Sequence, residues 1–430
     1  MTTAPRAAAR TCFVSLTVVL ATVATSTSAL AVGGRPDRSF SDDGRATAFR
    51  NGGAAYAVAI DRRGRILVAG YDVGRRDTDL ALARFRSNGR LDRRFGGGDG
   101  RVTTDLGGTD YGFDVAIGSR GRIVVAGMRE RRRSSRMAVA VYGPRGRLDR
   151  SFSRNGIAFV GFGRAFQGAT SVAIGASGRI VAGGWTSNGE TSRWALTRLR
   201  RRGARDRAFG GDGRVTADLS AAHEQINDLT IVSGGAIVAV GSAETRLKPR
   251  VALARFRIGG SLDRRFGNRG VKRTDVANGA DFAYGVVEQA GGRLIVVGHA
   301  ANGGRSDWSV LRYRRGGRLD DTFHGDGIRI VGFAGGYEVA HAATAQANGR
   351  IVVVGRFVRS GDDRFGVVRL KANGHDDLGF SNDGRAIVRF GRGNATGRDV
   401  VRQRDGRIVV VGETIAAGRR RFAVARLLPS

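Results

Sequence analysis

Short apolar runs alternate with turn-forming residues along most of the chain, and the alternation returns at a fixed spacing. In one stretch the runs are Arg101–Asp105, Phe113–Ile117, Arg122–Gly127 and Met137–Tyr142, bounded by Gly, Asn, Asp or Ser. Runs of this kind are typical of β-strands, and none carries a helical period. The pattern therefore predicts four strands in each stretch and no sizeable helices.

Three sequence markers recur in seven copies. A Gly-Arg dipeptide before an aliphatic run recurs from Gly64 to Gly406 in steps of 57 residues, with Gly235-Ala236 as the fourth copy. An Ala-Leu-Ala-Arg-Phe run that begins at Ala81 recurs with the same step. The third marker is Asp-x-x-Phe, which begins at Asp37, Asp92, Asp149, Asp206, Asp263, Asp320 and Asp377. The chain is therefore a seven-fold repeat.

Four antiparallel strands in each of seven units predict an all-β fold, a seven-bladed β-propeller with four-stranded blades. A β-solenoid is the competing repeat fold, but its coils are typically ~20–30 residues long. Six of the Ala-Leu-Ala-Arg-Phe type runs are followed by a connector that contains Asp-x-x-Phe, but the seventh is not. The missing connector lies near the N-terminus, at Gly33–Phe40. We therefore expect the N-terminal segment to dock beside the C-terminal strand and close the ring.

The first residues have the composition of a secretory leader. Two arginines precede an apolar stretch, Cys12–Ala24, and Ala29–Ala31 follows as a small-residue cleavage site. This order predicts a signal peptide over residues 1–31 and a single mature domain over residues 32–430. The apolar stretch is too short to cross a bilayer of ~30 Å as a helix, although an uncleaved N-terminal anchor is the alternative. The expected location is secreted, either extracellular or in the cell envelope and periplasm.

The charge balance is strongly positive. Removing the two leader arginines leaves a net charge of +32, and only three of the 72 basic residues are lysines. Codon usage in a GC-rich genome accounts for arginine in place of lysine, but it does not account for the excess of positive charge. Such a chain collects polyanions non-specifically at low salt. Cys12 is the sole cysteine, so the mature chain has no disulfide and no thiolate metal site.

The connector Gly89–Val102, followed by Gly-Arg-Ile-Val-Val-Ala-Gly and Ala-Leu-Ala-Arg-Phe type runs, resembles the delta-60 repeat family of bacterial β-propeller proteins. The resemblance covers all seven units. It departs from the pattern at Gly235-Ala236 and before Asp377–Phe380, where His375-Asp376 stands in place of the usual Arg-Leu. The resemblance implies the propeller fold and no particular activity.

Two repeated features have a structural interpretation. We expect each Asp of Asp-x-x-Phe to cap a turn, its Phe to anchor the connector, and the following Gly to take a conformation closed to other residues. Calcium loops at Asp42–Gly44 and Asn382–Gly384 are the alternative, but the equivalents Ser153–Asn155 and Gly267–Arg269 lack the oxygen ligands. We expect one strand position to pair with the recurring Asp; its residues are Arg84, Val141, Arg198, Arg255, Arg312, Arg369 and Arg426.

No catalytic residue, cofactor or metal site can be assigned from the sequence. The histidines lie in five different regions, and surface or turn positions are expected for them, with convergence near the axis as the alternative. They are His223, His299, His324, His341 and His375. The carboxylates are scattered, and no motif of a hydrolase or a metalloenzyme occurs.

The loops indicate where a ligand would bind. In an antiparallel blade, the Gly-Arg turns and the connectors emerge on one face, and both are repetitive. The loops of the opposite face vary, so we expect a ligand there, although solvated loops without function are the alternative. The candidate residues of this variable face are Arg131, Arg132, Arg133, Trp185, Arg419, Arg420 and Arg421.

The resulting functional hypothesis is a non-enzymatic binding or scaffold protein whose basic variable face meets an anionic polysaccharide or an acidic protein. Nucleic acid is expected to bind only non-specifically, because interleaved aromatic residues are absent. The alternative is an extracellular propeller enzyme, a polysaccharide lyase or hydrolase, with its site in the central funnel. Clustered His, Asp, Glu or Tyr side chains in the funnel would favour the enzyme; a ring of Arg, Ser and Gly would favour simple binding.

Overall fold

The structure is a computed structural model that describes residues 33–49, 52–74, 76–220, 223–244, 248–333, 336–391 and 393–429. The expected signal peptide, residues 1–31 with Cys12, lies outside the described residues. Within the described part, helix is confined to two single 3-10 turns, η1 (Ser119–Gly121) and η2 (Ala290–Gly292). No described helix is long and apolar enough to cross a membrane.

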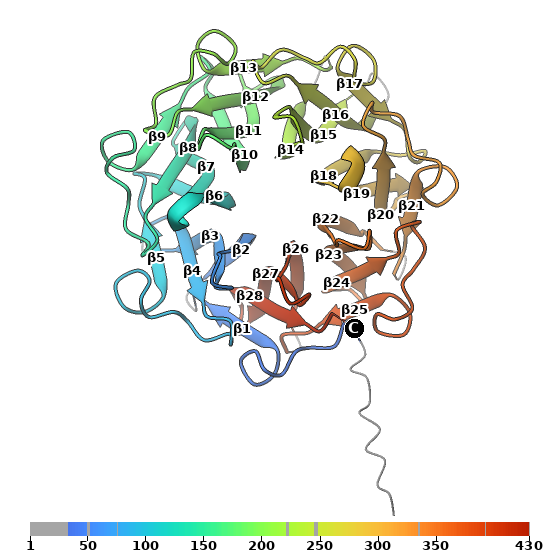
Figure 1. The fold of residues 1–430 in the computed structure, drawn as a ribbon. Helices are drawn as coiled ribbons and strands as arrows, with labels where there is room; N and C mark the ends of the chain where they lie inside the picture. Colours follow the sequence, from blue (N-terminus) through green and yellow to red (C-terminus); the bar gives the residue numbers. More distant parts are fainter. Residues whose placement is uncertain are drawn as a thin grey trace, which may run out of the picture. The chain divides into compact units, whose positions relative to one another are not determined.

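Seven four-stranded antiparallel sheets form the blades of a ring around a central axis, which confirms the predicted seven-bladed propeller (Figure 1). The innermost strands of blades one to seven are β2 (Gly53–Ile60), β6 (Thr109–Ile117), β10 (Phe166–Ile174), β14 (Glu224–Ile231), β18 (Asp281–Glu288), β22 (Val339–Ala345) and β26 (Ala395–Arg402). The second strands are β3 (Ile66–Val73), β7 (Ile123–Arg131), β11 (Ile180–Ser187), β15 (Ile237–Glu244), β19 (Leu294–Asn302), β23 (Ile351–Arg359) and β27 (Ile408–Ala416).

The two outer layers of strands complete the blades. The third strands are β4 (Thr78–Phe85), β8 (Ser134–Tyr142), β12 (Ser192–Leu199), β16 (Pro249–Phe256), β20 (Arg305–Tyr313), β24 (Asp362–Leu370) and β28 (Arg419–Leu427). The outermost strands are β5 (Arg101–Thr104), β9 (Ile157–Val160), β13 (Arg214–Ala217), β17 (Val271–Thr274), β21 (Ile328–Val331), β25 (Arg385–Val388) and β1 (Arg45–Ala48). Each outermost strand precedes the innermost strand of the next blade, so the sequence unit and the blade are offset by one strand.

The central strands are apolar on both faces because every blade is packed between two neighbours. In β3 the first five residues, Ile66–Gly70, are all buried. One core cluster joins Val124 and Val139 of blade two to Val172 and Ile180 of blade three, and the other clusters likewise span adjacent blades. A blade therefore buries its apolar surface only when both neighbours are present.

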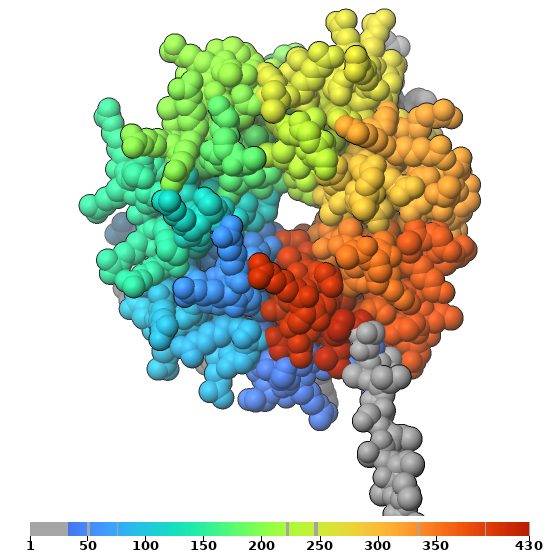
Figure 2. Space-filling view, in the orientation of Figure 1, coloured from blue at the N-terminus to red at the C-terminus, as the bar shows by residue number. Residues whose placement is uncertain are grey.

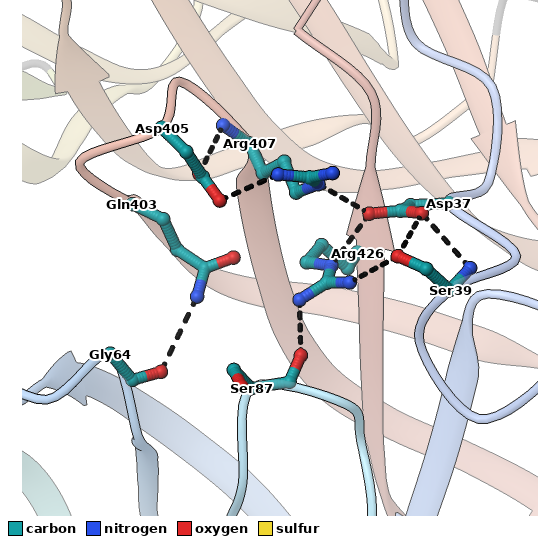
Figure 3. A network of polar contacts seen from close by, with 8 residues as sticks. All are labelled: Asp37, Ser39, Gly64, Ser87, Gln403, Asp405, Arg407 and Arg426. Atoms are coloured by element: carbon teal, nitrogen blue, oxygen red, sulfur yellow. Dashed lines mark hydrogen bonds and ion pairs between the residues drawn. The ribbon is translucent and has the colours of Figure 1, made fainter.

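The N-terminal segment closes the ring, as predicted. Strand β1 pairs antiparallel with β28, in the register Arg45 opposite Ala425. Upstream of β1, the Asp37 N–H donates to the Arg426 carbonyl at 2.8 Å. The Asp37 carboxylate accepts from Arg426 Nε at 2.8 Å and from Arg407 Nε at 2.7 Å (Figure 3). The outer strand of the seventh blade thus comes from the opposite end of the chain.

The arginine ring pairs with the recurring aspartate, which confirms its predicted structural role. The pairs are Arg84–Asp92, Arg198–Asp206, Arg255–Asp263, Arg312–Asp320, Arg369–Asp377 and Arg426–Asp37, with N–O distances from 2.7 to 3.3 Å. All are buried except Arg255–Asp263, which is partly exposed. Each of these arginines also donates to a carbonyl in the connector of the next blade, as Arg84 does to Pro144. In blade two, where Val141 replaces the arginine, Arg122 holds Asp149 at 3.3 Å.

The arginine of the Gly-Arg dipeptide has a role that the sequence did not reveal. It lies beside the same aspartate and gives it a second cation, as Arg179 does for Asp206 at 2.9 Å and Arg350 does for Asp377 at 2.7 Å. The Asp-x-x-Phe element is thus the meeting point of both arginine markers of the repeat. This explains why the three markers recur together.

The expectation that a glycine must follow Asp-x-x-Phe is wrong. Gly96, Gly210 and Gly267 have a positive φ at this position, but Ser41, Ser153, His324 and Ser381 adopt it as well. In all seven blades the N–H of this residue donates to a carbonyl of a neighbouring connector, as Ser153 does to Arg202 at 2.9 Å. That hydrogen bond offsets a left-handed strain of roughly 1–2 kcal/mol per residue.

We predict that the Asp37→Ala variant is strongly destabilised, because it leaves the buried guanidinium of Arg426 without its carboxylate. Breaking one partner of a buried pair costs about 3–5 kcal/mol. Urea unfolding followed by circular dichroism measures the loss. The matched control is Asp43→Ala, which removes an exposed carboxylate 3.3 Å from Arg45 and should unfold within about 1 kcal/mol of the parent. Equal midpoints for the two variants would contradict the closure by Asp37.

The closure is also expected to be sensitive to acid. Burial alone would raise the pKa of Asp37, but the hydrogen bonds from Ser39 and the charges of Arg426 and Arg407 hold it below 3.8. A folded-state pKa below the unfolded value gives stability that is present above pH 3.8 and lost as the pH falls below it. The difference in unfolding free energy between the parent and Asp37→Ala should therefore shrink on acidification below pH 3.8. A difference independent of pH in urea titrations would refute the assignment.

Candidate functional site

The two faces of the propeller carry different loops, as expected from the sequence. Hairpins between second and third strands, together with the links from one blade to the next, form the variable face. Arg131, Arg132 and Arg133 lie in such a hairpin, between β7 and β8, and Arg419–Arg421 open β28. Trp185 is different, because it lies within β11 and is partly buried rather than presented on a loop.

The structure does not bring the predicted loop arginines together. Those of β7 and β8 belong to blade two and those of β28 to blade seven, and blade one lies between them. Arg131 is held by the Gly107 carbonyl. Arg420 turns toward the axis and bonds Glu413 at 2.6 Å. The contact between Arg420 and Glu413 directs attention to a different group of side chains, which lies around the axial opening visible in Figure 2.

Every innermost strand carries a β-bulge at the same position. The register with the second strand shifts once in each blade, for instance between Ala55 and Ala57 in β2 and between Ala340 and Ala342 in β22. In all seven blades the bulged residue is partly exposed while the residue before it is buried. A bulge turns one side chain out of the regular pleat. In the strand nearest the axis, that side chain faces the axial opening.

The residue type at the bulged position changes from blade to blade. The residue before the bulge is Ala or Gly in six of the seven units, whereas the bulged residues are almost all different. They are Tyr56, Phe113, Thr170, Asn227, Tyr284, His341 and Arg398. We call this set the bulge ring. Residues that only support a scaffold would repeat with it, so this diversity marks the bulge ring as a candidate binding site.

The members of the bulge ring contact one another from blade to blade. The guanidinium of Arg398 lies 5.5 Å from the ring centroid of Tyr56 and 3.4 Å from His341 Nε2. On one side, Tyr56 and Phe113 have centroids 5.4 Å apart. On the other side, Tyr284 and His341 are 5.5 Å apart, edge to face. Five consecutive blades thus form a continuous wall of aromatic rings, imidazole and guanidinium.

A second set of unlike residues lies on the second strands, directly after a recurring glycine. Three of its members contact the bulge-ring residue of their own blade: Tyr71 contacts Tyr56, His299 contacts Tyr284, and Glu413 bonds Arg398 at 3.0 Å. We call this set the mouth ring. Its seven members are Tyr71, Met128, Trp185, Ser242, His299, Arg356 and Glu413. The two rings together form what we call the channel mouth.

The histidines of the channel mouth are held neutral. Burial and the guanidinium of Arg356 lower the pKa of His299 to about 4. Burial and the guanidinium of Arg398 hold the pKa of His341 well below its usual value. Burial also raises the pKa of Tyr284 to about 12. At neutral pH the mouth therefore combines an unprotonated imidazole, a protonated phenol and permanent guanidinium charges.

A layer of carboxylates lies one residue beyond the bulge ring. Asp114, Asp228 and Asp399 accept hydrogen bonds from the backbone N–H of the next blade at 2.7 to 2.8 Å. Ser171 Oγ lies 3.0 Å from Asp114 and 2.8 Å from Asp228. The Ser171 hydroxyl has a single proton to donate, so it cannot donate to Asp114 and Asp228 at once, and one of the two carboxyls carries a proton of its own. Burial and the neighbouring Asp114 raise the pKa of Asp228 to about 7. These groups link the blades.

The expectation of surface or turn positions is wrong for two histidines. His299 is 2% exposed and, with His341, lies in the channel mouth, because the ring brings together positions that are 42 residues apart in the sequence. The useful signal was present in the repeat itself. The residue after the recurring Gly of the second strand and the bulged residue both change type from unit to unit, and both rings can be read from that comparison.

The comparisons with known proteins agree with the fold and leave the function open. Residues 64–95, 175–209, 289–323, 346–380 and 403–430 match the family model described as Domain of unknown function (DUF5122) beta-propeller. Five segments of the chain thus resemble repeats of this β-propeller family. No curated protein matches the chain.

Solved structures with the same fold have diverse activities. A catalytically inactive virginiamycin B lyase from Staphylococcus aureus shares 12% identity over 88% of this chain and 97% of its own, with a TM-score of 0.51. The polysaccharide lyase Uly1 shares 11% over 89% and 91%, with a TM-score of 0.45. Sqt1 of Chaetomium thermophilum, bound to the N-terminus of ribosomal protein L10, shares 11% over 90% and 99%, also at 0.45. At these identities the likeness extends to the fold alone.

We predict that the two axial histidines respond to different arginines. Arg398→Met should raise the pKa of His341, because it removes the nearest positive charge, and Arg356→Met should raise the pKa of His299. The ring carbon and proton shifts of the histidines are followed by NMR from pH 8 down to the lowest pH at which the protein stays folded. They give each pKa, or its upper limit where the titration is incomplete. If either pKa lies at or above 6.5 in the parent protein, or both ignore the substitutions, the described mouth geometry is incorrect.

Proposed function

We propose that this protein binds an acidic saccharide at the channel mouth of its variable face. The proposal is carried by one observation: two strand positions whose residue type changes from unit to unit are gathered around the axial opening, and they supply aromatic faces together with guanidinium groups. A rigid frame that presents a few unlike side chains at a single mouth is the usual architecture of a binding site.

The chemistry of the mouth favours a ring-shaped anion. Arginine recognises carboxylates through two parallel N–H donors. Arg356 and Arg398 lie on adjacent blades. Each bonds one carboxylate of the chain, Asp363 at 3.1 Å and Glu413 at 3.0 Å, and each has further N–H donors for a ligand. Tyr56 and Tyr284 offer flat surfaces for the apolar face of a sugar ring. An acidic protein, the other anionic partner considered from the sequence, would instead be expected to use the exposed hairpin arginines.

A second pocket on the variable face is also lined by arginines, which suits an anionic ligand. Arg359, Arg364 and Arg389 line a cavity of about 370 Å³ between blades six and seven, on the variable face. Asp362 pairs with Arg364 at 2.7 Å, and Arg359 and Arg389 have no carboxylate within ion-pair distance in the described part of the chain. A polymer with several carboxylates could thus contact the mouth and the pocket together.

A second candidate function, cleavage of the bound saccharide by elimination, is favoured by the clustered titratable groups. Glycoside hydrolysis requires two carboxyl groups flanking the bond. In the described part of the mouth, Glu413 is engaged by Arg398 and Arg420, and the axial aspartates are engaged by backbone N–H groups. Elimination requires a neutral base, an acid and a cation for the carboxylate, which His341, Tyr284 and Arg398 offer.

The proposed elimination balances without an added reactant. The neutral imidazole of His341 removes the proton α to the uronate carboxylate, whose developing charge Arg398 stabilises. The electron pair forms a carbon–carbon double bond, and the glycosidic oxygen leaves with the phenolic proton of Tyr284. The products are a new reducing end and an unsaturated uronate, and proton exchange with water restores both side chains.

We expect the Arg398→Met variant to bind oligogalacturonate or oligoalginate about tenfold or more weakly, since losing a charged hydrogen bond costs roughly 1.5–3 kcal/mol. The matched control is Arg132→Met, which removes the same charge from an exposed hairpin. Isothermal titration at low and at physiological salt measures both, with maltohexaose as the neutral comparison. Equal losses for the two variants, or equal binding of maltohexaose, would show that the attraction is only non-specific.

For the second candidate, we expect ultraviolet absorbance from an unsaturated product when the parent protein is incubated with the oligosaccharide it binds best. His341→Gln should abolish the absorbance while retaining binding. Binding without any absorbance change would leave a binding protein and exclude the lyase.

Two further proposals concern the setting of this function. The leader-like residues 1–31 support export of the chain, so the ligand would be met outside the cytoplasm. The Gly-Arg, Ala-Leu-Ala-Arg-Phe and Asp-x-x-Phe markers support assignment of the repeats to the delta-60 type.

A further inference from the structure

Three carboxylates meet on the variable face where blade one contacts blade two. Asp79 lies near the start of β4, Asp105 directly follows β5, and Asp110 lies in β6. One oxygen from each can be chosen so that all three lie within 4.8 Å of one another. In a chain with a net charge of +34, none of the three has an arginine or lysine within ion-pair distance in the described structure.

The other blades show what normally occupies this place. The position of Asp79 is arginine in five of the seven units: Arg136, Arg193, Arg250, Arg364 and Arg421. In two of these blades the residue equivalent to Asp105 is an aspartate, and the arginine forms an ion pair with it. Arg193 holds Asp218 at 3.0 Å in blade three, and Arg250 holds Asp275 in blade four. Blade one keeps the acidic partner and replaces the guanidinium with a third carboxylate.

Asp110 is the buried member of the three, and only one of its carboxylate oxygens accepts a hydrogen bond. Asp110 is 0% exposed, and its Oδ2 accepts the Leu106 N–H at 2.5 Å. Its other oxygen, Oδ1, is buried without a hydrogen-bond partner. The nearby Arg129 and Arg131 do not satisfy it, because they donate to the carbonyls of Leu106 and Gly107.

The pKa values of the carboxyls also reflect the lack of a nearby positive charge. Burial, with the charges of Asp105 and Asp79 adding to it, raises the pKa of Asp110 to about 7. Burial and the charge of Asp79 raise the pKa of Asp72, which lies directly opposite Asp79 in the sheet, to about 6. Burial also raises the pKa of Asp281, the equivalent acid in blade five, but there the charges of Lys248 and Arg250 act to lower it.

We propose that Asp79, Asp105 and Asp110 bind a divalent cation, and that this cation takes the place of the arginine found in the other blades. The donor set consists of hard carboxylate oxygens, and one of its members is exposed, which leaves room for water ligands. Calcium accepts such oxygen-only sets with variable geometry, whereas magnesium requires a near-ideal octahedron. The cation would join β4 of blade one to β6 of blade two, and so lock the interface next to the channel mouth.

This site differs from the calcium loops considered at the Asp-Gly turns of the connectors. Those turns belong to the opposite face, and Asp43 there pairs with Arg45. The proposed cation site does not depend on the saccharide proposal, and either can fail alone.

The test uses the mature chain, stripped of metal with a chelator, and calcium chloride as the probe, with magnesium chloride in parallel. Isothermal titration should show one saturable calcium site that binds calcium more tightly than magnesium, and calcium should raise the melting temperature. Asp79→Asn should weaken calcium binding at least tenfold. Asp307→Asn is the matched control, because Asp307 occupies the same repeat position in blade five, where Gly332 replaces the second carboxylate; it should bind calcium like the parent.

A second variant tests the internal comparison. Asp79→Arg restores the residue of the other blades, so it should lose calcium binding and yet melt at a higher temperature than the metal-free parent. Absence of saturable calcium binding in the parent, tighter binding of magnesium, or unchanged calcium affinity in Asp79→Asn would overturn the proposal.

Discussion

Each blade of this propeller has two apolar faces and can bury both only between two neighbours, and the rest of the structure depends on that constraint. A linear array of such sheets would expose an apolar face at each end, so the array closes on itself. The segment that holds Asp37 and strand β1 leads along the chain into the first blade, and it is hydrogen-bonded to strand β28 of the last blade. It therefore joins the two ends of the array. The Asp–Arg contacts then repeat the same attachment at the other blades.

Closure has a consequence for function, because it carries seven equivalent positions of a linear sequence to one small opening. Most positions in the repeat serve contacts that are the same at every interface, so they are conserved from unit to unit. The bulge ring is not tied to one repeated contact: Thr170 and Asn227 donate to carbonyls of the next blade, whereas Arg398 contacts Tyr56 and His341. Differences between units therefore accumulate there, and unlike groups such as His341 and Arg398 become neighbours although 57 residues separate them.

The scaffold could be predicted from the sequence because it is periodic. Strand number, blade number, closure and the Arg–Asp pairing all follow from residues that recur in every unit. The channel mouth was harder to predict, because single residues such as His299 or Tyr284 belong to no motif, and their proximity arises only from the ring. Trp185 was assigned to the variable face for its type, but its strand places it in the mouth ring, whereas Arg131–Arg133 remain on the outer hairpin. The bulges, too, leave no mark in the hydrophobic pattern.

The channel mouth as ligand site is tested most directly by a crystal structure of the mature protein in complex with an oligouronate. The account predicts electron density for the sugar at the axial opening of the variable face, with its carboxylate against Arg398 or Arg356 and a ring against Tyr56 or Tyr284. Density confined to the hairpin arginines Arg131–Arg133, or to the face of the Gly-Arg turns, would contradict it.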